Sequence, residues 1–269
     1  LDLTGNNLGG LGEYAGPFAA ALAGCPSLQE LSLKNAGLGN LGDDAVRFAA
    51  ALAGCPNLQF LNFGGNSLGA LGEDAVGFAA ALAGCPSLQE LYLDYNDLRG
   101  LLGEDAVRFA AALARCPNLE KLDLTGHNLG GLGEDAVRFA AALAGCPNLQ
   151  RLHLCANNLV NLGEYAGPFA AALAGCPSLQ ELYLDYNRLG GLLGEDAVRF
   201  AAALAGCASL QKLDLGDNDL GDLGDDVGPF AKALAQCASL QNLYLRFNHF
   251  GSLGEDAFRF AAALAGCPK

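Results

Sequence analysis

The eleven residues LQKLDLGDNDL, at Leu210–Leu220, contain the pattern that decides the fold of this chain. Leucine occupies the first, fourth, sixth and last positions, and asparagine occupies the ninth. The alternation of Leu213, Asp214 and Leu215 predicts a short strand with one buried and one exposed face. Glycine, aspartate and asparagine follow, which is typical of a turn.

The residues after such a turn change to a helical period. In the stretch Pro56–Cys85, apolar side chains fall at positions i, i+3, i+4 and i+7, which places them on one face of a helix: Ala75, Phe78, Ala79 and Leu82. Alanine fills much of the remainder and favours the helix, while Gly84 and Pro86 end it. One unit is therefore strand, turn, helix and return.

This unit recurs along the whole chain at a nearly constant spacing. The equivalent leucines are Leu28, Leu58, Leu88, Leu119, Leu149, Leu179, Leu210 and Leu240, which are 30 or 31 residues apart. The two longer steps each contain one inserted leucine, Leu102 and Leu193. A fixed period predicts a solenoid in which each repeat contacts its neighbours. We expect nine repeats of about 30 residues in a single domain, 1–269, with no linker.

The pattern LxxLxLxxNxL, present as LQELYLDYNDL from Leu88, resembles a leucine-rich repeat. Its continuation LGEDAVRFAAAL is similar to the helical half of the ribonuclease-inhibitor-like subfamily, which also occurs in cytosolic NOD-like receptors. The resemblance implies an α/β horseshoe with a concave parallel sheet and convex helices. Its asparagine column maps to Asn6, Asn66, Asn96, Asn157, Asn187, Asn218 and Asn248. Ala36 and His127 interrupt that column, and we expect looser turns there.

The net charge of −14 reflects the scaffold more than a partner. Sixteen of the 29 acidic residues lie where the helices are predicted to begin, and acids there complement the helix dipole. An acidic chain without clustered Lys and Arg argues against nucleic acid and anionic membranes as partners. We see no apolar run of about 20 residues for a membrane span and no signal peptide.

The ten cysteines do not form a disulfide framework by position. Nine of them stand at the same place in successive repeats, at the end of each helix: Cys25, Cys55, Cys85, Cys116, Cys146, Cys176, Cys207, Cys237 and Cys267. Neighbouring helices lie about 8–10 Å apart, whereas a disulfide requires Cα atoms within about 7 Å. We expect small buried thiols and hence a reducing, cytoplasmic location.

The strand segment varies although the helix barely changes. LYLDYN at Leu91 becomes LHLCAN at Leu152 and LYLRFN at Leu243. The variable positions are predicted to face the concave side, and their aromatic and basic residues are typical of interfaces. We predict that another protein or peptide binds there, through Tyr92, Asp94, Tyr95, Lys121, Asp123, Arg151, His153, Tyr183, Asp185, Tyr186, Lys212, Asp214, Tyr244, Arg246 and Phe247.

Two other interpretations of the variable face remain open. Exposed Tyr, Thr and Asp can simply suit a strand, and the two copies of LYLDYN, 91 residues apart, fit a three-repeat duplication. A structural or designed array that self-associates end to end is the alternative function. Nearly invariant helices, the absence of Met, Ile and Trp, and ends without polar capping repeats favour it. A fragment, a processed chain or a consensus-style design would each fit this composition.

The chemistry-bearing residues do not assemble into a catalytic pattern. His127, His153 and Cys155 could converge on a metal, but zinc sites usually carry paired ligands. The glycine clusters lack the Gly-Lys-Ser/Thr of a phosphate loop. We therefore predict a chain that is not an enzyme and that has neither a metal site nor a cofactor.

Overall fold

The computed structural model describes residues 1–101 and 103–265, and within them two compact units. The first unit comprises Leu1–His127 and Gly145–Leu149, and the second comprises Asn128–Ala144 and Gln150–Lys269. The inserted Leu102 and the last cysteine of the predicted column, Cys267, lie outside the described residues. The expectation of one domain over 1–269 stays a prediction.

The first unit is a parallel sheet backed by helices. Its strands are β1 (Glu30–Ser32), β2 (Phe60–Asn62), β3 (Glu90–Tyr92) and β4 (Lys121–Asp123). Its helices are η1 (Leu8–Tyr14), α1 (Ala15–Ala23), η2 (Leu38–Leu41), α2 (Asp44–Leu52), η3 (Leu68–Leu71), α3 (Asp74–Leu82), η4 (Leu98–Gly100) and α4 (Gly103–Leu113), where η denotes a 3-10 helix. Neighbouring strands pair in equivalent register. The strand expected at the start of the chain is reduced to one bridge, between Asp2 and Ser32.

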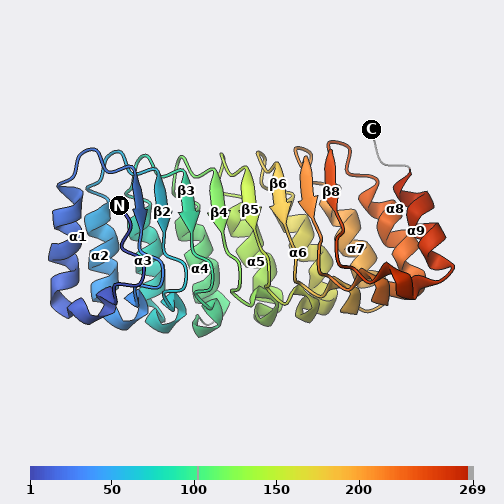
Figure 1. Ribbon diagram of the computed structural model, residues 1–269, viewed down its shortest axis with the longest axis horizontal. Helices are drawn as coiled ribbons and strands as arrows, with labels where there is room; N and C mark the ends of the chain where they lie inside the picture. The colour runs from blue at the N-terminus through green and yellow to red at the C-terminus, as the bar shows by residue number, and fades with distance from the viewer. Residues whose placement is uncertain (102, 266–269) are drawn as a thin grey trace. The chain divides into compact units, whose positions relative to one another are not determined.

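The second unit repeats this arrangement. Its strands are β5 (Arg151–His153), β6 (Glu181–Tyr183), β7 (Lys212–Asp214) and β8 (Asn242–Tyr244), again parallel and in equivalent register. Its helices are η5 (Leu129–Leu132), α5 (Glu134–Leu143), η6 (Leu159–Tyr165), α6 (Ala166–Leu173), η7 (Leu189–Gly191), α7 (Glu195–Leu204), η8 (Leu220–Asp226), α8 (Val227–Leu234), η9 (Phe250–Leu253) and α9 (Asp256–Leu264). Within each unit the strands form one layer and the α-helices the other (Figure 1). The α/β repeat fold predicted from the sequence is confirmed.

The core lies between these two layers. The middle leucine of a strand, such as Leu61, is fully buried, as are Phe78 and Leu82 of the helix in the same repeat. Phe63, the next inward residue after β2, meets Phe78 edge-on with ring centroids 5.0 Å apart. Neither the strand nor the amphipathic helix could bury its apolar face alone, so stacking of repeats completes the core. The predicted inward set is therefore confirmed.

In eight of the described repeats a glycine with positive φ turns the chain from the 3-10 segment into the α-helix. Gly42 has φ 54° and ψ −135°, and Gly133 has φ 57° and ψ −126°. This backbone region is essentially closed to residues with a Cβ. The α-helices are 8 to 11 residues long, and no helix in the described ranges has the length and apolar character needed to cross a membrane.

The asparagine column connects each repeat to the one before it. Asn66 Nδ2 donates to the carbonyls of Leu33 and Phe63, each at 2.8 Å. Its Oδ1 accepts from the backbone N–H groups of Ala36 at 2.9 Å and Leu38 at 3.1 Å. One buried side chain therefore satisfies backbone groups of two successive turns, which would otherwise be buried without partners.

The turns at the two interruptions of the column keep hydrogen bonds to neighbouring repeats. The turn at Ala36 is held by Asn66 of the following repeat, and Ala36 is fully buried. His127 is also buried, and its Nε2 donates to the carbonyl of Leu93 at 2.7 Å. That is one of the bonds that an asparagine makes at this position. The expectation of looser turns stays a prediction.

The cysteine column lies mostly inside the protein. Cys55, Cys85 and Cys116 are buried, whereas Cys25 is exposed. Burial raises the pKa of the Cys85 thiol to about 12 and that of Cys116 to about 11. All cysteines among the described residues are free thiols. The prediction of small buried hydrophobes is confirmed for the column from Cys55 to Cys237.

Candidate functional site

The strands present two side chains per repeat to the side opposite the helices. In β3 the central Leu91 is buried, while Glu90 and Tyr92 on either side are half-buried; β6 repeats this pattern with Glu181 and Tyr183 flanking its buried leucine. The structure thus places the variable strand positions together on one face in each unit. We call it the strand face.

On the strand face of the first unit, three side chains form a cross-strand network. The Tyr92 hydroxyl donates to Glu90 Oε2 at 2.9 Å, and it accepts from Lys121 Nζ at 2.5 Å. The Lys121 ammonium also lies 4.5 Å from the centre of the Tyr92 ring, within cation–π range. Phe60 contacts the Tyr92 ring from β2, with centroids 5.0 Å apart. The tyrosine is therefore held by both neighbouring strands.

The same network recurs on the strand face of the second unit. The Tyr183 hydroxyl donates to Glu181 Oε2 at 2.6 Å and accepts from Lys212 Nζ at 2.7 Å. His153, at the position that Asn62 holds in the first unit, stacks on the Tyr183 ring, with centroids 4.1 Å apart and planes at 18°. Lys212 lies 4.8 Å from the centre of the Tyr183 ring and 5.5 Å from that of Tyr244. Each unit thus contains its own Glu–Tyr–Lys network, built from residues at equivalent positions.

These contacts shift the titration of the second network. The hydrogen bond from Tyr183 lowers the pKa of Glu181, and the bond to Tyr183 raises the pKa of Lys212. Burial, assisted by the bond to Glu181, raises the pKa of Tyr183. Every shift favours the charged carboxylate, the charged ammonium and the neutral phenol. At neutral pH the network is therefore fixed in one protonation state.

Two of the predicted binding carboxylates are instead occupied by ion pairs. Asp94 pairs with Lys34 at 3.0 Å across Gly64, and its side chain is only 10% exposed. Asp214 pairs with Arg246 at 2.9 Å and is 5% exposed. A Cβ on Gly64 would overlap the Asp94 carboxylate. The pair between Lys34 and Asp94 therefore depends on glycine at that place.

The other predicted residues remain accessible to different degrees. Asp123 caps its own turn by accepting from the backbone N–H of Thr125 at 2.9 Å, and Arg151 is half-buried at the start of β5. Asp185 accepts from the Cys155 thiol at 2.8 Å. Tyr244 is exposed at the end of β8. Their role in binding stays a prediction.

The turn after each strand carries two residues in the left-handed backbone region. At the first, Tyr95, Tyr186 and Phe247 have φ values of 55°, 60° and 54° and are 61%, 58% and 70% exposed. Gly65 and Gly126 occupy this position in other repeats. A left-handed conformation costs an ordinary residue about 1–2 kcal/mol. These aromatic residues are therefore less suited to the turn than the glycines they replace.

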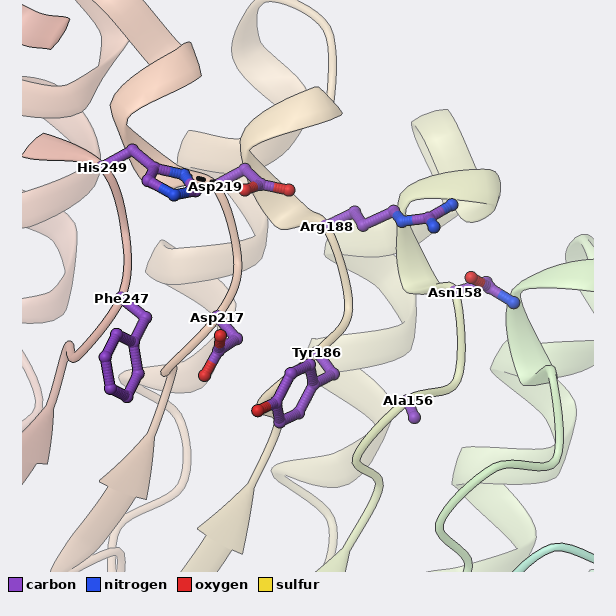
Figure 2. Close-up of a pocket in the computed structure, with 8 residues that line it drawn as sticks. All are labelled: Ala156, Asn158, Tyr186, Arg188, Asp217, Asp219, Phe247 and His249. Atoms are coloured by element: carbon purple, nitrogen blue, oxygen red, sulfur yellow. Dashed lines mark hydrogen bonds and ion pairs between the residues drawn. The ribbon is translucent and has the colours of Figure 1, made fainter.

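In the second unit the two left-handed residues of four successive turns line one groove. They form two rows, Ala156, Tyr186, Asp217 and Phe247 in the first, and Asn158, Arg188, Asp219 and His249 in the second (Figure 2). The groove has a volume of about 440 Å³. All eight lining residues have φ between 51° and 60°. We refer to these eight residues as the groove.

The groove contains residues that sequence reasoning missed. The second row comes from the single position between the column asparagine and the following leucine or phenylalanine, as in NRL from Asn187. That position varies as the strand face does, which was the available signal. His249 Nδ1 lies 3.2 Å from Asp219 Oδ1, and the charge of Asp217 raises the pKa of the Tyr186 phenol.

Comparison with known proteins agrees with this repeat architecture. Residues 115–133 and 206–224 match the family model described as Leucine Rich repeat. These stretches contain β4 and β7 with their turns, and the same strand, turn and helix recur in the other described repeats. Two stretches of the chain therefore match leucine-rich repeats, and the fold of the described repeats agrees with that match.

Solved structures also resemble the chain at low sequence identity. The leucine-rich repeat-containing protein LegL7 from Legionella pneumophila is 19% identical, with 97% of each chain covered and a TM-score of 0.45. The structure titled Leiomodin-1 Actin-Binding Site 2 is 18% identical, over 52% of this chain and 76% of that one, with a TM-score of 0.39. No curated protein matches the chain.

Proposed function

We propose that this chain is a recognition module that binds another protein or peptide through the strand face and the turns at its edge. The observation that carries the proposal is the set of exposed aromatic side chains on this side: Tyr95, Tyr186, Tyr244 and Phe247. Tyrosine, tryptophan and arginine dominate the binding energy of protein interfaces. Solenoids commonly use such extended surfaces for binding.

The two strand networks support the proposal because they hold their tyrosines in place before a partner arrives. Tyr92 and Tyr183 are each fixed by a carboxylate and an ammonium from two strands. Side chains already ordered lose little conformational freedom on binding. The two units therefore offer equivalent, preorganised contact points.

We also place the chain in the cytoplasm and in the ribonuclease-inhibitor-like group of leucine-rich repeats. The column of buried, uncharged thiols fits a reducing compartment, because cysteines stay reduced in the cytosol, whereas extracellular proteins tend to form disulfides. The subfamily assignment rests on the helical sequence LGEDAVRFAAAL.

Affinity capture from a cell lysate tests the proposal. The immobilised chain is compared with a variant carrying Tyr92→Ala, Tyr183→Ala and Tyr244→Ala. The matched control carries Arg47→Ala, Arg138→Ala and Arg259→Ala, which remove three long side chains from the helices. The three arginines pair with acids near the start of a helix, within 4.0 Å, and their side chains are at least half exposed, so little stability is lost.

A protein retained by the chain and the control but lost by the tyrosine variant supports the strand face as its binding surface. Identical capture by all three proteins contradicts the proposal. Capture of only further copies of the chain supports the alternative, an array that self-associates end to end. Urea unfolding of the three proteins checks that each is folded.

A further inference from the structure

The groove of the second unit places an acidic side chain between two exposed aromatic rings. Figure 2 shows the Asp217 carboxylate flanked by Tyr186 on one side and Phe247 on the other, all three in the first row. The backbone joins them in order, since Tyr186 N–H donates to Gly216 and Asp217 N–H donates to the carbonyl of Arg246. Three successive turns therefore position two rings and one carboxylate side by side.

The turn does not require these residues. The same place in the first unit holds Tyr95 in one repeat but Asn35, Gly65 and Gly126 in others, and the left-handed backbone accommodates asparagine and glycine more readily. Tyr186 and Phe247 have neither that advantage nor burial, since both are exposed. Folding alone therefore gives no account of the rings in the first row.

The charges around the rings are acidic on balance. Asp185, Asp214, Asp217 and Asp219 lie in or beside the groove, against Arg188 and Arg246. The Arg246 guanidinium is engaged by Asp214 at 2.9 Å. The Asp217 carboxylate accepts a hydrogen bond from the Tyr186 hydroxyl, and no ion pair with Lys or Arg is formed by Asp217 among the described residues. A cation between the rings would lie beside both rings and the Asp217 carboxylate.

We propose that the groove binds an extended peptide segment and holds one of its arginine or lysine side chains between Tyr186 and Phe247, on the carboxylate of Asp217. Cation–π contact with the rings and a charge-assisted hydrogen bond to Asp217 supply the recognition. The groove crosses four turns, about 14 Å at strand spacing, which roughly four extended residues span. This proposal rests on the proposed function and assigns its partner chemistry.

Selection of peptides against the full chain tests this assignment. Random ten-residue peptides displayed on phage are selected on the immobilised protein, and an enriched peptide is synthesised with a fluorescent label for anisotropy titration. We expect enriched sequences to share one arginine or lysine. Replacement of that residue by glutamine, or Asp217→Asn in the protein, weakens binding on the order of tenfold.

The variants are chosen so that folding is unaffected. Asn accepts the left-handed backbone as Asp does, so Asp217→Asn removes only the charge. Asp225→Asn is the matched control, because Asp225 is 94% exposed and lies outside the groove. Tyr186→Gly and Phe247→Gly install the glycine already used at this place in other repeats, and each weakens binding roughly two- to fivefold.

A double change decides the contact itself. Once Asp217→Asn is present, replacing the basic residue of the peptide by glutamine costs little further affinity, because the two groups act as one pair. Enriched peptides without a basic residue, an equal loss with Asp225→Asn, or full affinity with Asp217→Asn each overturn the proposal. So does a pool from which no peptide is retained.

Failure of the groove and failure of the proposed function give different results. Peptides that lose affinity in the variant of Tyr92, Tyr183 and Tyr244 but bind Asp217→Asn unchanged overturn the groove assignment and leave the strand face as a binding surface. Capture that is identical for all proteins, together with an unproductive pool, overturns both.

Discussion

Replacing His127 by asparagine provides a direct test of how the ladder of turns is stabilised. The imidazole occupies the place of an asparagine, is fully buried, and donates from Nε2 to the carbonyl of Leu93 at 2.7 Å. Asn66 and Asn187 donate to the equivalent carbonyls of Leu33 and Leu154 at 2.8 and 2.9 Å. An asparagine at 127 can therefore make the same bond without a titratable group.

The magnitude follows from the pKa of the histidine. Burial lowers the pKa of His127 from its ordinary 6.5 to about 4, against the opposing hydrogen bond to Leu93. Between these values the unfolded chain takes up a proton that the folded chain does not, so stability falls as pH falls. The contribution is fully present above pH 6.5 and is lost towards pH 4. From pH 7.5 to 5.0 this loss amounts to about 2 kcal/mol, at about 1.4 kcal/mol per pH unit.

Urea unfolding at a series of pH values measures this loss. The difference in unfolding free energy between the protein and His127→Asn should change by about 2 kcal/mol between pH 7.5 and 5.0, the variant being the less acid-sensitive. His249→Asn is the control, because it removes an exposed histidine from another turn with left-handed residues. Parallel pH dependences for the protein and His127→Asn would refute the reasoning.

Three further predictions address the ladder, the left-handed turns and the thiols. Asn187→Ala should lower the unfolding free energy by about 2–4 kcal/mol, because four buried backbone bonds lose their partner; Asn6→Ala, at an exposed site with one 3.4 Å bond, should change it by less than about 0.5. Tyr186→Gly should leave stability unchanged or raise it by up to about 1 kcal/mol, since relief of the left-handed backbone exceeds the added freedom of the unfolded chain; urea unfolding checks both variants. Iodoacetamide labelling at pH 8, mapped by mass spectrometry, should modify Cys25 and Cys155 first. The buried thiols with raised pKa values should react last: Cys85, Cys116, Cys176 and Cys207.

The fold could be predicted from the sequence because its rules are local and repeated. The alternation around Leu213 and the helical spacing of Phe78 and Leu82 each report on a buried face within one repeat. The repeats can be compared with one another as internal controls. The helix residues that stay constant are those fixed by packing, and the strand residues that vary lie on the exposed face. The partners of the asparagine side chains were harder to predict from the sequence, because Asn66 bonds to the turn of a repeat that lies 30 residues earlier.

The candidate site could be predicted only in part, because its details depend on contacts between repeats. Nothing near Asp94 in the sequence indicates that Gly64 leaves room for its pairing with Lys34. The same holds for Arg246, which reaches back to Asp214. The alternation of residues predicts which side chains face outwards, but it does not predict which of them form ion pairs with one another.

The second row of the groove was missed for a different reason. Arg188 and His249 each follow a column asparagine and look like ordinary turn residues in the sequence. Their φ values of 57° and 55° place them in the left-handed region, where their side chains project in the same direction as those of the neighbouring turns. The row of aligned side chains thus depends on a left-handed backbone conformation, which cannot be predicted from the residue types at these positions.

The left-handed backbone also distinguishes the residues that suit the turn from those that the turn merely tolerates. Every described turn needs a left-handed residue after its strand, and glycine or asparagine meets that need at Gly65, Gly126 and Asn35. Tyr186 and Phe247 meet it at greater cost in free energy and remain exposed. In a chain whose helices barely vary, residues kept against the preference of the backbone indicate a requirement other than folding. The first place to look for that requirement is the groove they line.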